Sequence, residues 1–258
     1  MPAMRADQLL VERGLAASRS QAARLIAGGL RWRADAGTPW RSVGKNGDEL
    51  PDGAELELVD AAEARYVSRG GLKLEGALAV AGLAVGGWRC LDVGQSTGGF
   101  TDCLLQQGAA QVAGVDVGHG QLHSRLREDA RVVALEKVNA RALSAVALAQ
   151  AGAPPPFDLA VGDLSFISLT LALPAVAPLV KPGGHLLMLV KPQFELQPAQ
   201  VGKGGIVRDP ALYAVVEQRL REACAALGLP VRHWLPSPIA GGDGNREFFV
   251  HAVRPGGA

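Results

Sequence analysis

The sequence predicts an α/β protein, in which a doubly wound and mostly parallel sheet follows a small α+β unit. Three observations support this fold class. Apolar strand-like runs alternate with helix-like segments from residue 86 onward, a glycine-rich loop follows the first of those runs, and residues 1–60 have a charge balance of their own. Alternation of this kind indicates parallel strands joined by helices that cover both faces of the sheet.

The expected strands of the main sheet are short apolar runs. They cover residues 88–93, 112–117, 131–135, 157–162 and 185–190. Helical patterns fall between them at residues 101–107, 121–127 and 141–150. Two later runs, 231–235 and 247–253, are separated by a glycine-rich turn without a helix, which predicts an antiparallel pair that closes the sheet.

The small unit is expected to span residues 1–60, with residues 61–73 as a linker and the start of the main domain, which covers 74–258. Gly14 would stop a first helix, and Ser18 would cap a second one that ends at Gly28. Short strands are expected near residues 30–33 and 54–59.

Charge is distributed unevenly in this unit. Residues 1–46 carry eight Arg and Lys against three acids, whereas residues 47–60 carry six acids and no base. A purely structural helical hairpin is compatible with this pattern. However, arginines recur along both expected helices, and guanidinium groups placed in this way favour contacts with phosphates.

Composition limits the classes of function. The 258 residues give one large domain and one small one, and the net charge of +1 indicates no polyanion partner for the protein as a whole. Three scattered cysteines do not suggest a disulfide framework. Charges interrupt the first 30 residues, and the apolar run 169–180 is too short to span a membrane. We therefore expect a cytoplasmic protein.

Residues 91–102, LDVGQSTGGFTD, are the most informative segment. A strand that ends in Asp92, a loop with several glycines and a following helix form the architecture that binds nucleotide-like ligands. The acid before the glycines, and the lack of a lysine for a phosphate, suit S-adenosylmethionine (SAM). Asp116 ends the next apolar run, at the spacing of an acid that accepts the ribose hydroxyls of a nucleoside. An ordinary strand-to-helix turn is the alternative.

Four charged residues lie in apolar or glycine-rich contexts: Lys73, Asp163, Lys191 and Glu247. Asp163 and Lys191 follow expected parallel strands, whose carboxyl ends form the ligand crevice of a doubly wound sheet. Glu247 begins an antiparallel strand, so it belongs to the same edge. A single charge at a strand end is usually a capping or solvated residue. Four that converge favour a catalytic cluster.

Such a cluster suits methyl transfer to a ribose 2′-hydroxyl, which must lose its proton as it attacks the methyl group. The work then consists of positioning and deprotonation. A lysine acts as a base only when it is neutral. Desolvation and a neighbouring lysine favour that form, whereas adjacent carboxylates favour the charged form and orient the amine. We assign Lys191 as the base and Lys73 as the residue that orients the hydroxyl, with Asp163 and Glu247 holding both amines.

Two resemblances extend these interpretations. The N-terminal positions Arg5, Asp7, Leu10, Gly14, Ser18-Arg19, Ala22, Ile26 and Gly29 resemble the small RNA-binding domain shared by a ribosomal small-subunit protein, pseudouridine synthases and tyrosyl-tRNA synthetases. The segment Arg31–Asp35 departs from the usual turn of that domain. Over residues 66–247, the motifs YVSRGGLKL, LDVGQSTGGFTD, GVDVGHGQL, GDLSFISL, LVKPQFE, GIVRDP and GNREFF resemble the TlyA-type 2′-O-methyltransferases of ribosomal RNA, historically labelled haemolysins.

The second resemblance implies roles for individual residues. Its Lys-Asp-Lys-Glu tetrad falls on Lys73, Asp163, Lys191 and Glu247, and its substrate is cytidine in ribosomal RNA. The implied cofactor contacts are Asp92, Gly94, Ser96, Thr97, Gly98, Asp116 and Asn139. The expected RNA contacts are Arg5, Arg19, Arg24, Arg65 and Arg69. Gln95 departs from the small residue usual in the family, which would change how the loop meets the methionine end of SAM.

Two other functions fit parts of the pattern. A membrane-damaging cytolysin is suggested by the family label, but the missing signal peptide, the missing spans and the intact tetrad argue against it. A non-catalytic assembly factor that binds RNA and senses SAM would not need all four charged residues. No metal is expected, since His119 and His123 lack a third ligand nearby.

Overall fold

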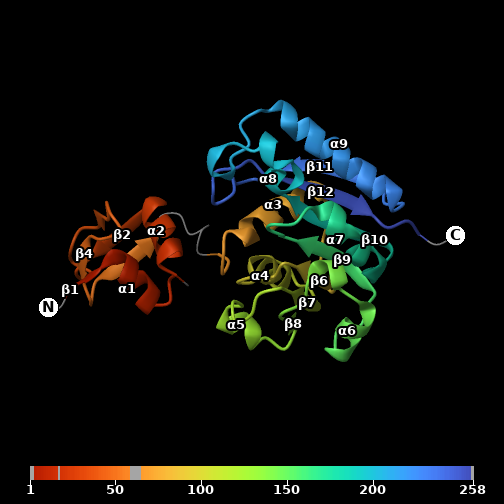
Figure 1. The fold of residues 1–258 in the computed structure, drawn as a ribbon. Coiled ribbons are helices and arrows are strands. Elements are labelled where there is room, and N and C mark those ends of the chain that lie inside the picture. The colour runs from red at the N-terminus through yellow and green to blue at the C-terminus, as the bar shows by residue number, and fades with distance from the viewer. Residues whose placement is uncertain (1–2, 17, 59–64, 257–258) are drawn as a thin grey trace. The chain divides into compact units, whose positions relative to one another are not determined.

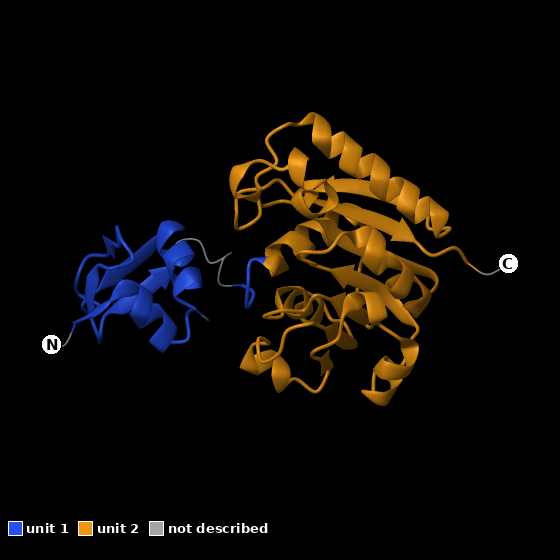
Figure 2. Cartoon of the chain, in the orientation of Figure 1, with its two compact units in different colours: residues 1–69 blue, residues 70–258 orange. Residues whose placement is uncertain are grey.

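The computed structural model describes residues 3–16, 18–58 and 65–256. The chain forms two compact units, residues 1–69 and 70–258 (Figure 2). The division falls where helix α3 (Gly70–Ala81) begins, so the last residues of the expected linker 61–73 belong to the first turn of that helix. Residues 59–64, which include the start of that linker, lie outside the described residues.

Unit 1 contains the two expected helices, α1 (Ala6–Glu12) and α2 (Arg19–Ala27). Ser18 caps α2, because its Oγ accepts a hydrogen bond from the Gln21 backbone N–H at 3.2 Å. The remaining elements are short strands: β1 (Ala3–Arg5), β2 (Leu30–Arg33), β3 (Arg41–Ser42), β4 (Glu49–Pro51) and β5 (Glu55–Leu58). Both helices bury leucines and alanines in a core of their own beside Leu30 and Leu50, so the unit does not depend on the main sheet for its core.

Unit 2 is built on a seven-stranded sheet in the order β11-β12-β10-β9-β6-β7-β8. Its strands are β6 (Arg89–Val93), β7 (Gln111–Val115), β8 (Val132–Leu135), β9 (Phe157–Gly162), β10 (Val180–Val190), β11 (Val231–Pro236) and β12 (Phe248–Val253). Strands β6 to β10 pair in parallel, and β12 pairs antiparallel with both β10 and β11. The predicted α/β class and the antiparallel closing pair are confirmed.

Helices cover both faces of this sheet (Figure 1). One face packs against α6 (Ala145–Gln150), α7 (Leu169–Val176) and α9 (Ala211–Ala226), whose buried side chains join the strand residues in one large core. The other face carries α3 and α4 (Gly99–Gln106), and there Phe100 stacks on the fully buried Phe249. The shorter helices α5 (Ser124–Arg127) and α8 (Pro192–Glu195) lie in loops at the ends of strands.

The strand order creates a switch point between β6 and β9. The chain runs outward from β6 through β7 to β8 and then returns to β9 on the other side of β6. The loops that leave β6 and β9 therefore diverge at their carboxyl ends, where open α/β sheets bind ligands. None of the helices in the described part of the chain is long and apolar enough to cross a membrane.

Candidate active site

A cavity of about 920 Å³ opens at this switch point. Its wall comes from the loops after β6, β7 and β9 and from the segment around Asn139, and its size suits a nucleoside-sized ligand. Four of the predicted cofactor residues line it: Gly94, Ser96, Asp116 and Asn139. The predicted catalytic residue Asp163 lines it as well.

Gly94 is required where the loop leaves β6. Its φ is +88°, and a Cβ atom there would lie 2.6 Å from the Asp163 carbonyl oxygen. Any side chain would therefore push the β6 and β9 loops apart. The Gly94 and Gln95 backbone N–H groups both donate to the Val115 carbonyl oxygen, at 2.8 and 3.1 Å, which ties the loop to β7.

Asp116 organises the opposite wall. One carboxylate oxygen accepts the Ser96 backbone N–H at 2.7 Å, and the other accepts the Gly118 backbone N–H at 2.7 Å. Ser96 itself has a φ of +48°, so this contact holds a strained backbone position. Asn139 caps the 3₁₀ turn Ala140–Ala142 by accepting the Arg141 backbone N–H at 2.9 Å.

The other predicted cofactor residues, Asp92, Thr97 and Gly98, do not line this cavity. Asp92 is completely buried beneath the loop, where burial raises the pKa of its carboxyl group to about 7. Thr97 is exposed, and its carbonyl oxygen accepts the His123 backbone N–H at 3.2 Å. Gly98 packs so closely on Leu126 that a Cβ atom would lie 2.3 Å from that side chain.

Gln95, the residue that departs from the family's usual small one, points away from the cavity. Its side chain is buried against Gly114 and donates to Thr101 Oγ1 at 2.9 Å, and Thr101 in turn donates to Asp92 at 2.7 Å. The second Asp92 oxygen, Oδ1, has no hydrogen-bond partner among the described residues. A glutamine is tolerated here because it completes this buried network.

The four predicted catalytic residues form two ion pairs. Lys191 Nζ lies 2.5 Å from Asp163 Oδ1 and donates to Ser165 Oγ at 2.8 Å. Lys73 Nζ lies 2.6 Å from Glu247 Oε2, and both of these side chains are buried, with 9% and 3% exposed. The Asp163 side chain is 25% exposed and the Lys191 side chain 13%, so this pair is the more open of the two.

The two pairs are also close to each other. Burial raises the pKa of Glu247, Lys73 and Lys191 lower it, and Asp163 raises it further. Charges act in this way only on near neighbours, so the four residues form one cluster. They come from the first turn of α3, the carboxyl ends of β9 and β10, and the residue before β12.

Several residues of the site escaped the sequence interpretation. Phe166 lines the cavity and is 91% exposed with a φ of +64°, and its ring lies 5.1 Å from that of Phe194. Asp243, in the turn before β12, accepts a hydrogen bond from Gln193 at 3.0 Å and feels the charge of Lys191. The glycine-rich segment around Asp243 could have indicated that this residue belongs to the site. Nothing in the sequence distinguishes Phe166 from a core residue.

Three of the arginines predicted to contact RNA have described partners within unit 1. Arg5 and Arg19 both pair with the buried carboxylate of Asp7, at 3.0 and 2.8 Å, and these contacts hold its pKa well below the usual range. Arg24 donates to the Ser20 carbonyl oxygen at 3.1 Å. Arg65 is exposed and Arg69 is half-buried, and both engage in further interactions.

Asp116 gives a direct test of ligand binding in the cavity. Asp116→Ala is expected to weaken SAM binding by about 1.5–3 kcal/mol, or roughly ten- to hundredfold, because a charged acceptor and the support of Ser96 are both removed. Asp116→Asn, which keeps one acceptor oxygen, should fall in between. Calorimetric titration with SAM measures both, and equal affinity in all three proteins would remove Asp116 from the ligand site.

Comparison with known proteins agrees with this geometry. The chain is 46% identical over 246 residues to the 16S/23S rRNA (cytidine-2′-O)-methyltransferase TlyA of Mycobacterium tuberculosis, a match that covers 95% of this chain and 88% of that one. It is 45% identical over 252 residues to YqxC of Bacillus subtilis (strain 168), covering 98% and 86%. A solved structure from Streptococcus thermophilus that carries a hemolysin name has a TM-score of 0.74 at 41% identity and covers 99% of this chain and 90% of that one. The model of the FtsJ-like methyltransferases matches residues 66–254, and the chain belongs to that family.

Proposed function

We propose that this protein methylates a ribose 2′-hydroxyl in ribosomal RNA, with cytidine as the modified nucleoside and SAM as the methyl donor. One observation carries the proposal: two lysine–carboxylate pairs converge beside a cavity whose wall contains Gly94, Asp116 and Asn139. Family membership supports the reaction class. The name of the relative from Mycobacterium tuberculosis supports the RNA and the nucleoside.

The residues of the cavity fit SAM. Gly94 leaves room that a Cβ atom would fill, and Asp116 offers carboxylate oxygens for ribose hydroxyls. When it is bound, SAM supplies an electrophilic methyl group on a sulfonium that is already a good leaving group. The chain must therefore position the hydroxyl and remove its proton.

The two ion pairs divide this work. Lys191 first releases its ammonium proton to solvent, and the neutral amine then accepts the proton of the hydroxyl, while the contact with Asp163 fixes the direction of the amine. Lys73 is held by Glu247 in a buried position and orients the hydroxyl oxygen. Ser165, which accepts a hydrogen bond from Lys191, completes the set that holds this amine in one place.

The exposed Phe166 and the half-buried Phe194 line the cavity together, and such a pair of rings suits an unpaired RNA base. Phe166 is a large apolar residue, and side chains of this kind are usually buried. Here it is exposed to solvent, has a positive φ and lines the cavity beside Asp163 and Ser165. Strained positions of this kind concentrate at functional sites. Bases stack on aromatic side chains when they are removed from a helix, so Phe166 and Phe194 form a surface for the target nucleoside.

A glycine at position 166 separates this role from a structural one. Phe166→Gly should not lower the stability of the protein, because glycine relieves the positive φ. It should weaken RNA binding by about 1–3 kcal/mol, the usual contribution of one stacked base. Thermal unfolding and the KM for RNA measure these two effects. Val146→Gly, at an exposed site on α6, is the control. A KM equal to that of wild type would exclude base stacking on Phe166.

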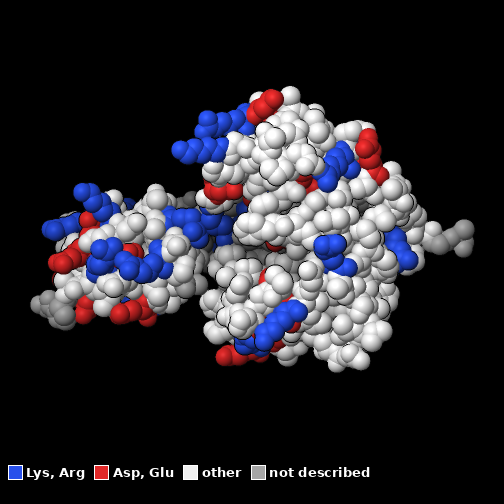
Figure 3. All heavy atoms as spheres, viewed as in Figure 1, with Lys and Arg blue, Asp and Glu red and all other residues white. Residues whose placement is uncertain are grey.

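Unit 1 is proposed to bind RNA. Figure 3 shows lysine and arginine side chains gathered on the visible face of this unit, with acids among them. The Asp7 contacts hold Arg5 and Arg19 in fixed positions while leaving 46% and 59% of their side chains exposed. Fixed and exposed guanidinium groups suit phosphate contacts, because little side-chain entropy is lost on binding.

The function is tested by incubating the protein with radiolabelled SAM and separated ribosomal subunits or free ribosomal RNAs, and then mapping the labelled nucleotide. Label on the ribose of a cytidine is the expected result. Label on a base would show that the tetrad serves another reaction. Tight binding of SAM and RNA without transfer of label would instead support an assembly factor.

A further inference from the structure

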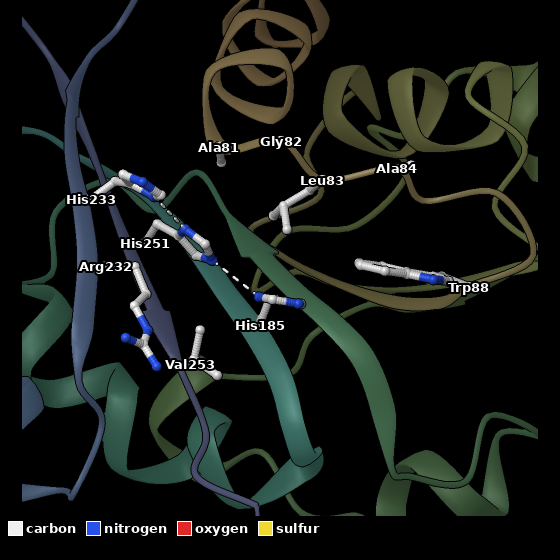
Figure 4. Close-up of a pocket in the computed structure, with 10 residues that line it drawn as sticks. All are labelled: Ala81, Gly82, Leu83, Ala84, Trp88, His185, Arg232, His233, His251 and Val253. Carbon is white, nitrogen blue, oxygen red and sulfur yellow. Dashed lines mark hydrogen bonds between the residues drawn. The ribbon is translucent and has the colours of Figure 1, made fainter.

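A second pocket lies within unit 2, on the sheet face that carries α3, and the methyl-transfer site does not use it. Its volume is about 680 Å³, and it is lined by the end of α3 and the loop that follows, by Trp88, and by residues of β10, β11 and β12. Three histidines, one from each of these strands, form its polar side: His185, His233 and His251 (Figure 4).

The three imidazoles form a hydrogen-bonded chain. His185 Nδ1 lies 3.1 Å from His251 Nε2, and His233 Nδ1 lies 2.9 Å from His251 Nδ1. The central ring, His251, uses both of its nitrogens and is 3% exposed. The rings thus make a chain and not a cage, in agreement with the finding that the described residues contain no group able to hold a metal ion.

A β-bulge brings a cation to the same pocket. The pairing of β11 with β12 shifts by one residue between Val231 and His233, which leaves Arg232 as the extra residue. Such a bulge re-aims a side chain that regular alternation would send to the other face of the sheet. Arg232 accordingly lines the pocket together with His233, and its charge acts on His251.

The tautomers of the three histidines in this hydrogen-bonded chain determine which ligand it can bind. When all three rings are neutral, each hydrogen bond of the chain needs one N–H donor and one bare nitrogen acceptor. Of the two nitrogens outside the chain, His185 Nε2 and His233 Nε2, one therefore carries a proton and the other does not. If His251 gains a proton, it donates to both neighbours, and His185 and His233 then both carry their remaining proton on Nε2. These two Nε2 donors lie at opposite ends of the histidine chain (Figure 4), so the pocket would offer an oxyanion an imidazole donor at either end and the Arg232 guanidinium as the cation.

The other charged and aromatic groups around the histidine chain also favour an oxyanion. Lys181 acts on His185 from the same strand, and its ammonium group pairs with Asp158 of β9 at 2.5 Å. Asp158 also accepts the Arg89 backbone N–H at 2.7 Å. Trp88 stacks on His185 with ring centroids 5.6 Å apart, and the residues from α3 and its loop bring no charge. None of the described residues that line the pocket is acidic.

We propose that this pocket binds a phosphate group and that the histidine chain takes up one proton from solvent when it does so. In the empty pocket, burial lowers the pKa of His251 to about 4, so the chain is neutral near neutral pH. An anion beside the outer rings raises that pKa again. Proton uptake makes binding tighter as the pH falls, by up to about tenfold per pH unit. The proposal is independent of methyl transfer.

The test uses the full-length protein with ¹⁵N-labelled histidine and sulfate as the probe, because sulfate does not titrate near neutral pH. NMR should show His251 becoming doubly protonated as sulfate is added. The affinity should be higher at about pH 6 than at about pH 8, following the linkage of binding to proton uptake. Arg232→Gln should weaken sulfate binding at least about tenfold. Arg221→Gln, at a surface pair on α9, should leave it unchanged.

Competition identifies the source of the phosphate. Displacement of sulfate by a single-stranded RNA oligonucleotide would assign the pocket to the RNA backbone, and displacement by inorganic phosphate alone would assign it to free phosphate. Ring signals that do not respond to sulfate, a response that is equal in Arg232→Gln, or sulfate that neither competitor displaces would overturn the proposal.

Discussion

Lys191→Ala is expected to lower the rate of methyl transfer by about 10²–10⁴-fold, the usual contribution of a general base, and to leave SAM affinity close to that of wild type. The reason is its position. Lys191 follows β10, contacts Asp163 at 2.5 Å and Ser165 at 2.8 Å, and lies outside the wall of the cofactor cavity. Single-turnover kinetics with saturating SAM and RNA measure the chemical step.

Lys191 is a cleaner test than Lys73. Removal of Lys73 would leave the buried Glu247 without its partner, and an unpaired buried charge destabilises a fold. Asp163 is partly exposed and can be hydrated when Lys191 is absent. Lys181→Ala is the matched control, since Lys181 lies on the same strand at its other end and pairs with Asp158 in a similar way. Near-normal turnover of Lys191→Ala would assign the base to another residue.

The sequence was sufficient to predict the sheet and the convergence of the tetrad, because both follow from where apolar runs end. Strand ends in a parallel sheet share one edge, so Asp163 and Lys191 could be placed together before their contact was known. The start of β10 was missed by five residues. The segment Lys181–Gly184 looks like a turn, and in the structure it is an irregularity in the pairing with β9 between Val180 and His185.

Side-chain direction was harder to predict. Gln95 lies in the cofactor motif, but its side chain points into the protein interior. It does so because there is space above Gly114 and because the Thr101 hydroxyl accepts its hydrogen bond. Phe166 has the character of a core residue, and the backbone of its loop holds it in solvent. A count of charges likewise could not show that Arg5 and Arg19 share Asp7. Each of these outcomes depends on neighbours distant in sequence or on local backbone geometry.

Removal of unit 1 is the second change with a large expected effect. A chain of residues 70–258 keeps the whole cofactor cavity and the tetrad, so its SAM affinity should equal that of the full protein. Its kcat/KM for RNA should fall strongly, because binding energy from remote parts of the substrate no longer positions the ribose. The slope of log affinity against log salt should also flatten, by about 0.7–0.9 for each phosphate that the shortened chain no longer neutralises.

Point variants must respect the role of Asp7. The double variant Arg5→Ala/Arg19→Ala would remove both partners of a buried carboxylate and could act by unfolding unit 1. Arg24→Ala leaves Arg5 and Arg19, the two partners of Asp7, in place. This variant should reduce the slope of log affinity against log salt by about the contribution of one phosphate contact. Arg127→Ala, at the surface pair with Glu136 in unit 2, is the control. If the truncated chain methylates RNA as efficiently as the whole protein, with the same salt dependence, unit 1 has no part in RNA binding.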